Sequence, residues 1–157
     1  MAAATIPLHE TSLGSRGATD LSAKLRHCVL LIEDDKDAMR WVQHALKHYG
    51  NGKYQLDWKQ CLSDGLLRLL NGGIDLILLD LGLGDCSSPF TESWVRKAAP
   101  RVPMVVLTGD PSQETGYYTT GSGIYLVKGQ VSPLGLVEAI SSALGGRVPS
   151  KESSQLA

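Results

Sequence analysis

The sequence predicts an α/β fold built on a doubly wound, five-stranded parallel sheet flanked by helices. Two observations indicate this class. Apolar runs typical of strands alternate with helical patterns over residues 27–146. Two of these runs, residues 74–81 and 102–108, have an uninterrupted apolar centre, which is typical of central strands in a parallel sheet, because helices cover both of its faces. The alternation therefore favours a sheet built from βα units.

The five predicted strands are short and bounded by turn residues. Residues 28–33 predict a buried strand, and 74–81 and 102–108 predict the two that are buried on both faces. Residues 54–58 alternate between apolar and polar side chains, as an outer strand does. Residues 124–128 form the fifth strand.

The predicted helices follow from apolar spacing and capping signals. Residues 36–49 place apolar side chains on one helical face. Ser63 is the expected cap of the second helix, and Ser132 followed by Pro133 opens the last one. Serine is a favoured N-cap and proline a favoured first helical residue.

The third helix is expected to begin at Ser88-Pro89, by the same cap-then-proline order. Phe90, Trp94 and Ala98 then recur one turn apart. This spacing predicts an apolar stripe along the helix.

The regular pattern covers the middle of the chain but neither end. The 157 residues suit one domain, which we place at 27–146. Residues 1–26 carry scattered small and polar side chains, and 147–157 are polar with little periodicity. We expect a flexible N-terminal arm and a flexible C-terminal tail.

The composition argues against several classes of protein. Lys and Arg together number 15, and Asp and Glu together number 16. The chain therefore lacks the excess of basic residues that is typical of nucleic-acid binding. No apolar run is long enough to cross a membrane. The three cysteines, Cys28, Cys61 and Cys86, form no CxxC pair, so we expect reduced thiols and a cytoplasmic location.

Charged and polar side chains stand where the predicted strands end. Glu33, Asp34 and Asp35 follow the first strand, Asp80 ends the third, Thr108 the fourth and Lys128 the fifth. Ligands of such sheets gather at the carboxyl ends of the strands. Several carboxylates at one edge repel each other unless a hard cation lies among them, and an all-oxygen set suits Mg²⁺.

The lysine and the threonine indicate phosphoryl chemistry. Together with a metal ion, Lys128 and Thr108 would neutralise the charge of a transferring phosphoryl group. Asp80 would then be the nucleophile, as in enzymes that form an aspartyl phosphate. Taken alone, each residue has a plainer explanation: Asp34 or Asp35 would cap the following helix, and Asp80 would cap a loop.

The stretches "VLLIEDD", "IDLILLDLGL", "PMVVLTG" and "YLVKGQ" resemble, in order and spacing, the strand ends of one known family. This family is the receiver (CheY-like) domain of two-component response regulators, and the similarity covers about residues 28–144. It implies a flavodoxin-like receiver fold with strand order 2-1-3-4-5. It also implies a histidine kinase or histidine phosphotransfer protein as phosphoryl donor and a downstream effector protein as target.

The resemblance assigns roles to the residues around the phosphoryl group. Asp80 would accept the phosphoryl group in an Mg²⁺-dependent reaction. Lys128 would contact the phosphoryl oxygens, and Thr108 would swing toward them as the switch hydroxyl. Tyr125 would be the aromatic residue coupled to that movement. The chain would act as a switch that catalyses only its own phosphotransfer and dephosphorylation, and would not be a turnover enzyme.

The resemblance also implies a magnesium site. Asp34 would bind the ion directly and Glu33 through water, while Asp80 and the backbone carbonyl of Gly82 would complete the protein ligands. The signalling face of the family is formed by its fourth helix, fifth strand and fifth helix.

The segment between Thr108 and Tyr125 departs from the family pattern. It is about two residues short and carries several glycines and threonines, which have low helix propensity. We therefore expect a short or irregular fourth helix. Tyr117 and Tyr118 within it are candidates for partner contact, with packing into the core as the alternative.

Other functions compete with a phosphorylated switch. A degenerate receiver would bind partners without phosphorylation, although the intact site argues against it. A phosphatase with an aspartate nucleophile would need a second acid where Gly82 stands. A flavodoxin-like cofactor binder would place phosphate against Glu33, Asp34 and Asp35, which repel it. Since no output domain is evident, we expect a stand-alone receiver, with a fragment of a longer protein as the alternative.

Overall fold

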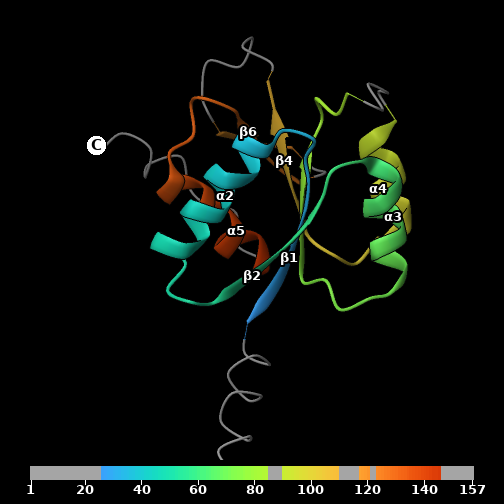
Figure 1. Ribbon diagram of the computed structural model, residues 1–157, viewed down its shortest axis with the longest axis horizontal. Coiled ribbons are helices and arrows are strands. Elements are labelled where there is room, and N and C mark those ends of the chain that lie inside the picture. The colour runs from blue at the N-terminus through green and yellow to red at the C-terminus, as the bar shows by residue number, and fades with distance from the viewer. Residues whose placement is uncertain (1–25, 85–89, 110–116, 121–122, 146–157) are drawn as a thin grey trace, which may run out of the picture.

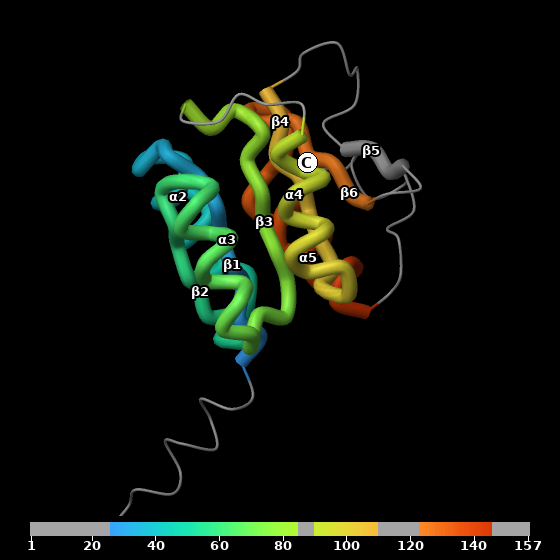
Figure 2. The backbone as a smooth tube through the Cα atoms, turned by 90° about the vertical axis from the view of Figure 1, so that its right-hand side faces the viewer, coloured from blue at the N-terminus to red at the C-terminus, as the bar shows by residue number. Residues whose placement is uncertain are grey.

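The computed structural model describes residues 26–84, 90–109, 117–120 and 123–145. The elements in chain order are β1 (His27–Ile32), α2 (Lys36–Tyr49), β2 (Tyr54–Lys59), α3 (Leu62–Leu70), β3 (Leu76–Asp80), α4 (Thr91–Ala98), β4 (Met104–Thr108), β5 (Tyr117–Thr120), β6 (Gly123–Val127) and α5 (Pro133–Leu144). The strands form one sheet, with α2 and α5 on one face and α3 and α4 on the other (Figure 1 and Figure 2). No helix in these ranges is long and apolar enough to span a membrane.

The predicted parallel sheet is confirmed, and an antiparallel strand is added at its edge. The strand order is β2-β1-β3-β4-β6-β5. The first five of these are parallel and have the predicted order. β5 pairs with β6 in the antiparallel direction, with Tyr117 opposite Leu126 and Thr120 opposite Gly123.

The new strand corrects the prediction of a helix in this part of the chain. Residues 117–120 form β5, so Tyr117 and Tyr118 lie in an edge strand. Tyrosine and the β-branched threonine favour extended backbone over helix, and the edge of β6 offers hydrogen-bonding partners for it. The role of Tyr117 and Tyr118 in partner contact stays a prediction.

Alternating strand residues divide the core into two layers. Val29 and Leu31 pack beneath α2 and α5, whereas Leu30 and Ile32 pack beneath α3 and α4. All four side chains are fully buried. This is the pattern of a central strand covered on both faces, because successive side chains point to opposite sides.

Two helices begin at the predicted caps. Asp35 caps α2 and accepts a hydrogen bond from the backbone of Asp37 at 2.8 Å. Ser132 caps α5, with Pro133 as its first residue. The prediction for α3 is wrong by two residues, because its cap is Cys61 and Ser63 lies inside the helix. The intervening Leu62 is buried against the sheet, and this packing extends the helix toward its N-terminus.

The third predicted helix begins later, and its buried face lies beside the predicted apolar stripe. α4 starts at Thr91, and Ser88 and Pro89 lie outside the described residues. Thr91 and Val95 face the core, whereas Phe90 is 60% and Trp94 43% exposed. The predicted apolar stripe is therefore not the buried face of α4. A helix this short contacts the sheet through one i, i+4 pair. The neighbouring apolar stripe is therefore left exposed.

Candidate functional site

The strand register brings the predicted site residues to one edge of the sheet. The paired residues are Ile32 with Leu79, Asp80 with Leu107, and Thr108 with Val127. Since parallel strands advance together, Glu33 lies level with Asp80, Thr108 follows one step further along and Lys128 two steps. Four residues from distant parts of the sequence therefore meet where α/β sheets bind ligands.

Three carboxylates form a compact acidic cluster at this edge. Ligand atoms of Glu33, Asp34 and Asp80 lie within 4.8 Å of one another. Glu33 is fully buried and Asp80 is 2% exposed, while Asp34 faces solvent. The oxygen donors and the concentrated negative charge fit a hard divalent cation such as Mg²⁺. The cluster is thus a candidate metal site that opens to solvent on the Asp34 side.

Lys128 lies between the two buried carboxylates. Its Nζ is 2.8 Å from Glu33 Oε2 and 2.8 Å from Asp80 Oδ2. Burial disfavours the charged ammonium, but the contacts with Asp80 and Glu33 outweigh it and raise the pKa of Lys128. Gly129 follows with φ +82°, a conformation that glycine adopts readily and other residues rarely. The backbone therefore turns sharply directly after the lysine.

The loop after β3 holds two of the acids by backbone hydrogen bonds. The Gly82 amide donates to Asp80 Oδ1 at 3.0 Å, and the Gly84 amide donates to Asp34 Oδ2 at 2.8 Å. Because Asp35 is the cap of α2, Asp34 is available to the acidic cluster. This placement decides between the two carboxylates that the sequence left as possible caps. The Gly82 carbonyl as a magnesium ligand stays a prediction.

Burial disfavours the charged form of Glu33. Burial raises its pKa to about 7, opposed by the contact with Lys128 and aided by the charge of Asp80. The backbone carbonyl of Glu33 accepts a hydrogen bond from the Trp58 indole at 2.7 Å. The side chain of Glu33 is therefore buried in the site and titrates near neutral pH.

This raised pKa predicts a pH dependence of stability in the metal-free protein. Between the ordinary pKa of 4.5 and the native value of about 7, the native state binds a proton on Glu33 that the unfolded chain has released. The free energy of unfolding should therefore fall as pH rises through this window, by at most about 1.4 kcal/mol per pH unit. Urea unfolding at a series of pH values measures the slope.

The neutral variant Glu33→Gln provides the control for that titration. Gln keeps the shape of the side chain but cannot titrate. The free energy of unfolding of the variant should therefore depend less on pH between 4.5 and about 7 than that of the wild type. Mg²⁺ should stabilise the wild-type protein most above pH 7, where the carboxylate is charged and free to bind a cation. An identical slope in wild type and variant would assign the pH dependence to other groups.

The structure adds a contact for Tyr125 that the sequence did not reveal. Tyr125 is 8% exposed, and its hydroxyl donates to Glu92 Oε1 at 2.7 Å. Arg96 Nε donates to the same oxygen at 2.8 Å. Thr108 is also buried, at the end of β4. Only the i, i+4 spacing of Glu92 and Arg96 is visible in the sequence; the link to Tyr125 requires the folded chain.

The sequence and the fold are both similar to response regulators. No family model matches the chain. The swarming motility regulation protein RssB of Serratia marcescens is 32% identical over 115 residues, which are 72% of this chain and 49% of that protein. The chain thus spans about half the length of this curated relative.

Two solved structures show the extent of the fold similarity. A CheY-like receiver domain protein from Methanospirillum hungatei superimposes with a TM-score of 0.61 at 21% identity, over 77% of this chain and 95% of that one. A response regulator receiver protein from Sinorhizobium medicae gives 0.62 at 18% identity, over 78% and 98%. The sheet order, the flanking helices and these similarities together identify the chain as one with the CheY-like receiver fold of response regulators.

Proposed function

We propose that this receiver works in a two-component phosphorelay and accepts a phosphoryl group on Asp80. The observation that carries the proposal is the position of the Lys128 ammonium, 2.8 Å from both Asp80 and Glu33, beside a third carboxylate. A structural ion pair needs one acid. Two further acids and a lysine at the end of one sheet match the charges needed to bind a cation and a phosphoryl group together.

The proposed reaction is an in-line transfer. A carboxylate oxygen of Asp80 forms a bond to phosphorus while the bond from phosphorus to the donor nitrogen or oxygen breaks, and the electron pair leaves with the donor. Lys128 would exchange its contact with Asp80 for the phosphoryl oxygens. Mg²⁺ held by Glu33, Asp34 and Asp80 would supply neutralising charge. Later attack by water on phosphorus would break the bond to the Asp80 oxygen, release inorganic phosphate and restore the carboxylate, so the chain would act as a switch that resets itself.

The proposed partners follow from the relatives. Proteins described as response regulators share the fold, and one relative is described as a regulator of swarming motility. We propose a histidine kinase or histidine phosphotransfer protein as donor and a separate effector protein as target, both in the cytoplasm. Cys28 and Cys61 are free thiols, which agrees with a reducing compartment.

The switch would link the phosphoryl group to β6 and α5. Thr108 and Tyr125 lie on neighbouring strands, β4 and β6, and both are buried. A hydroxyl that moves toward the phosphoryl group would change the space available to the tyrosine ring. Part of the output face would differ from that of relatives, because β5 occupies residues where a helix was expected.

Replacing Thr108 with Ala should separate phosphorylation from the switch. The acceptor and the charges around it remain, so labelling by phosphoramidate should continue largely intact. The change in backbone amide shifts of β6 and α5 should be blunted, because the hydroxyl that follows the phosphoryl group is missing. Two-dimensional NMR before and after phosphorylation measures this. Full wild-type shifts in the variant would remove Thr108 from the switch.

The test of the proposed function is direct labelling. The protein is incubated with acetyl phosphate or phosphoramidate, with and without Mg²⁺, and weighed intact by mass spectrometry. The expected result is a gain of one phosphoryl group that requires the metal. No gain in a folded protein with Mg²⁺ present would contradict the proposal and favour a receiver that binds partners without phosphorylation.

A further inference from the structure

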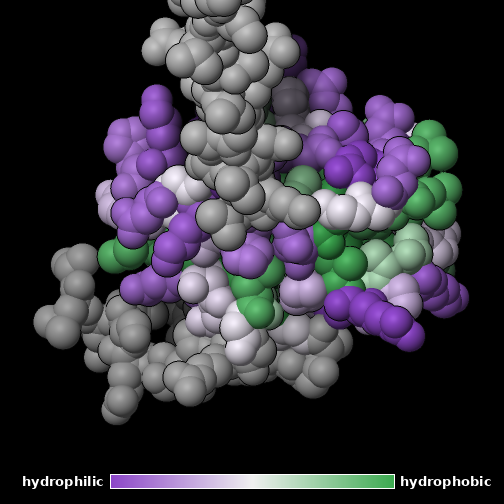
Figure 3. Space-filling view, turned by 90° about the horizontal axis from the view of Figure 1, so that it is seen from below, coloured by the Kyte–Doolittle hydropathy of each residue, from purple (hydrophilic) through white to green (hydrophobic). Residues whose placement is uncertain are grey.

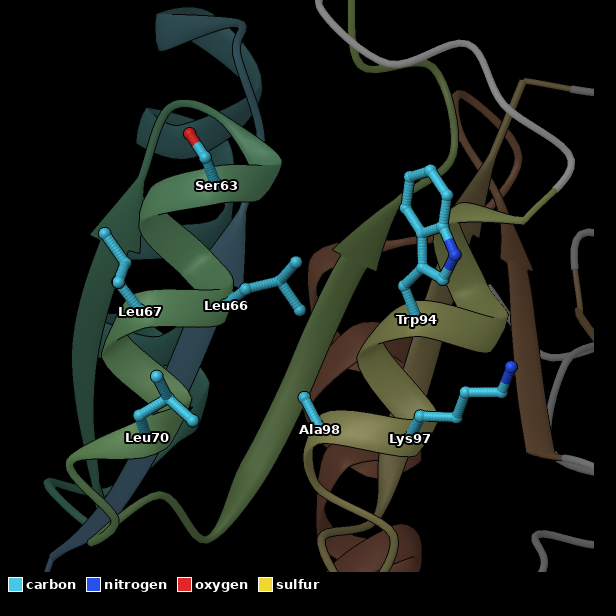
Figure 4. Close-up of a pocket in the computed structure, with 7 residues that line it drawn as sticks. All are labelled: Ser63, Leu66, Leu67, Leu70, Trp94, Lys97 and Ala98. Carbon is cyan, nitrogen blue, oxygen red and sulfur yellow. The ribbon is translucent and has the colours of Figure 1, made fainter.

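The two sides of the molecule differ in polarity. Seen from below, the side that carries α2 is largely hydrophilic, whereas apolar surface gathers on the side that carries α3 and α4 (Figure 3). An apolar groove of about 550 Å³ between α3 and α4 is lined by Ser63, Leu66, Leu67, Leu70, Trp94, Lys97 and Ala98. Its lysine side chain points away from Leu70 (Figure 4). Because a ligand is selected by a few placed polar groups, the groove does not indicate what it would bind.

Polar groups placed close together are found on α2, where two histidines form a pair. His44 and His48 are four residues apart, so they lie on one face of the helix, one turn apart. Their ring centroids are 3.9 Å apart, and the rings are stacked with an angle of 26° between their planes. Both side chains are exposed. Two imidazole rings are therefore held side by side and open to solvent.

A hydrogen bond to the backbone fixes the protonation pattern of one ring. Nδ1 of His48 lies 3.0 Å from the backbone carbonyl oxygen of His44. A carbonyl oxygen only accepts hydrogen bonds, so Nδ1 carries the proton in this contact. In the neutral ring, Nε2 then has a free lone pair. Histidines that bind metal ions commonly donate their other ring N–H to a backbone carbonyl in this way.

The spacing of the two rings suits a shared metal ion. Histidines at i and i+4 on one helix face bind a single ion in zinc proteins. With metal–nitrogen bonds of about 2.0–2.1 Å, two ligand nitrogens on one ion lie roughly 3–3.5 Å apart. Rings whose centroids are 3.9 Å apart reach this separation by a small rotation, and exposed side chains rotate readily. Water would complete the coordination of the ion.

The position of the pair in α2 does not by itself explain the stacking. Lys47 and His48 place basic side chains in the last turn of the helix, where they interact favourably with its C-terminal carbonyls. His44 lies one turn earlier, and its contact with the His48 ring adds nothing to that interaction. A shared ligand gives both rings a role.

The histidine pair is separate from the acidic cluster. Asp34 lies just before the start of α2, whereas His44 and His48 lie in its second half. At 1.5 Å per residue, the two histidines are roughly 12–18 Å along the helix from its first residue. An ion bound to the histidines therefore does not contact the carboxylates.

We propose that His44 and His48 bind a divalent transition-metal ion through one nitrogen of each ring. Imidazole nitrogen favours ions such as Zn²⁺, Ni²⁺ and Cu²⁺, with Cu²⁺ bound most tightly, and Mg²⁺ favours the oxygen donors of the acidic cluster. The bound ion connects two successive turns of α2 and stabilises the C-terminal half of the helix. Its binding requires neither Mg²⁺ nor phosphorylation of Asp80.

Nuclear magnetic resonance of the full, unphosphorylated chain tests the proposal with Zn²⁺ as the probe. The titration is run at about pH 8, where imidazole is neutral, with Mg²⁺ in excess to occupy the acidic cluster. The ring nitrogen signals of His44 and His48 should shift together with one Zn²⁺ per pair. Amide hydrogen exchange in the last two turns of α2 should become slower. Cu²⁺ should displace Zn²⁺, and Mg²⁺ alone should leave both rings unchanged.

Histidine variants show whether the two rings share one ion. His44→Gln and His48→Gln should each weaken Zn²⁺ binding at least about tenfold, because either change removes the second ligand of a chelate. The double variant should bind only slightly more weakly than either single variant. His27→Gln changes another exposed histidine, near Asp75, and should leave binding unchanged. Since His44 and His48 are exposed, their variants are expected to fold.

Three results would overturn the proposal. Equal Zn²⁺ affinity in the wild type and the double variant would place the ion elsewhere on the chain. Shifts that vanish when Mg²⁺ is added would assign the ion to the acidic cluster. Losses of affinity that simply add in the double variant would show two independent histidines without a shared ion, and a stacked pair with a purely structural role.

Discussion

Replacing Asp80 with Asn is expected to abolish metal-dependent labelling by acetyl phosphate. In the proposed reaction the carboxylate is the nucleophile, and a neutral amide has neither its charge nor its reactivity. The amide keeps the size of the side chain and retains an oxygen that can accept the hydrogen bond from Gly82. Loss of labelling in a folded protein would therefore report chemistry and not misfolding. Intact mass spectrometry after incubation with Mg²⁺ measures it.

A matched substitution elsewhere separates the acceptor from unspecific acylation of acids. Asp64 is an exposed acid in the first turn of α3, outside the acidic cluster. Asp64→Asn should be labelled as fully as the wild type. If Asp80→Asn continued to gain a phosphoryl group at the wild-type level, another residue would be the acceptor and the assignment of the site would be wrong.

Replacing Lys128 with Met should have the largest effect on stability. It removes the one cation between two carboxylates that are 0% and 2% exposed, and leaves their repulsion uncompensated. Removing one partner from a fully buried ion pair costs about 3–5 kcal/mol. The cost here should be about 2–3 kcal/mol, below that range, because the Lys128 side chain is 33% exposed and Glu33 readily takes up a proton.

Urea unfolding of the variant with and without Mg²⁺ tests this explanation. A divalent cation replaces the missing positive charge, so Mg²⁺ should stabilise the variant more than it stabilises the wild type. Lys97→Met is the control, since Lys97 is exposed and has no ion pair among the described residues; its effect should stay within about 0.5 kcal/mol. A Lys128 variant as stable as the control would show that the carboxylates do not depend on the lysine.

Local sequence patterns predicted the regular elements of this domain well. The helix at 36–49 is observed with the predicted bounds, and the strands differ by one or two residues at their ends. Apolar periodicity and capping act over a few neighbouring residues, so they can be read without the fold. The prediction failed at 117–120, where pairing with β6 decides the conformation.

The residue types at the strand ends predicted the candidate site, but their contacts depended on the fold. Either Asp34 or Asp35 could cap a helix, and their contacts distinguish them: the Gly84 amide holds Asp34, and Asp35 caps α2. The sequence does not indicate the contact between Glu92 and Tyr125, because the two residues are 33 positions apart. Pairings over such distances are set by the packing of α4 against the sheet.

The sequence by itself determined the alternation of strands and helices, the buried character of the central strands and the chemistry available at their ends. The tertiary structure alone decided which stripe of α4 is buried. Phe90, Trp94 and Ala98 have the spacing of a core stripe, yet Thr91 and Val95 face the sheet. Periodicity shows that an apolar stripe exists, but the rotation of the helix about its axis depends on the elements that surround it. That rotation leaves Trp94 exposed.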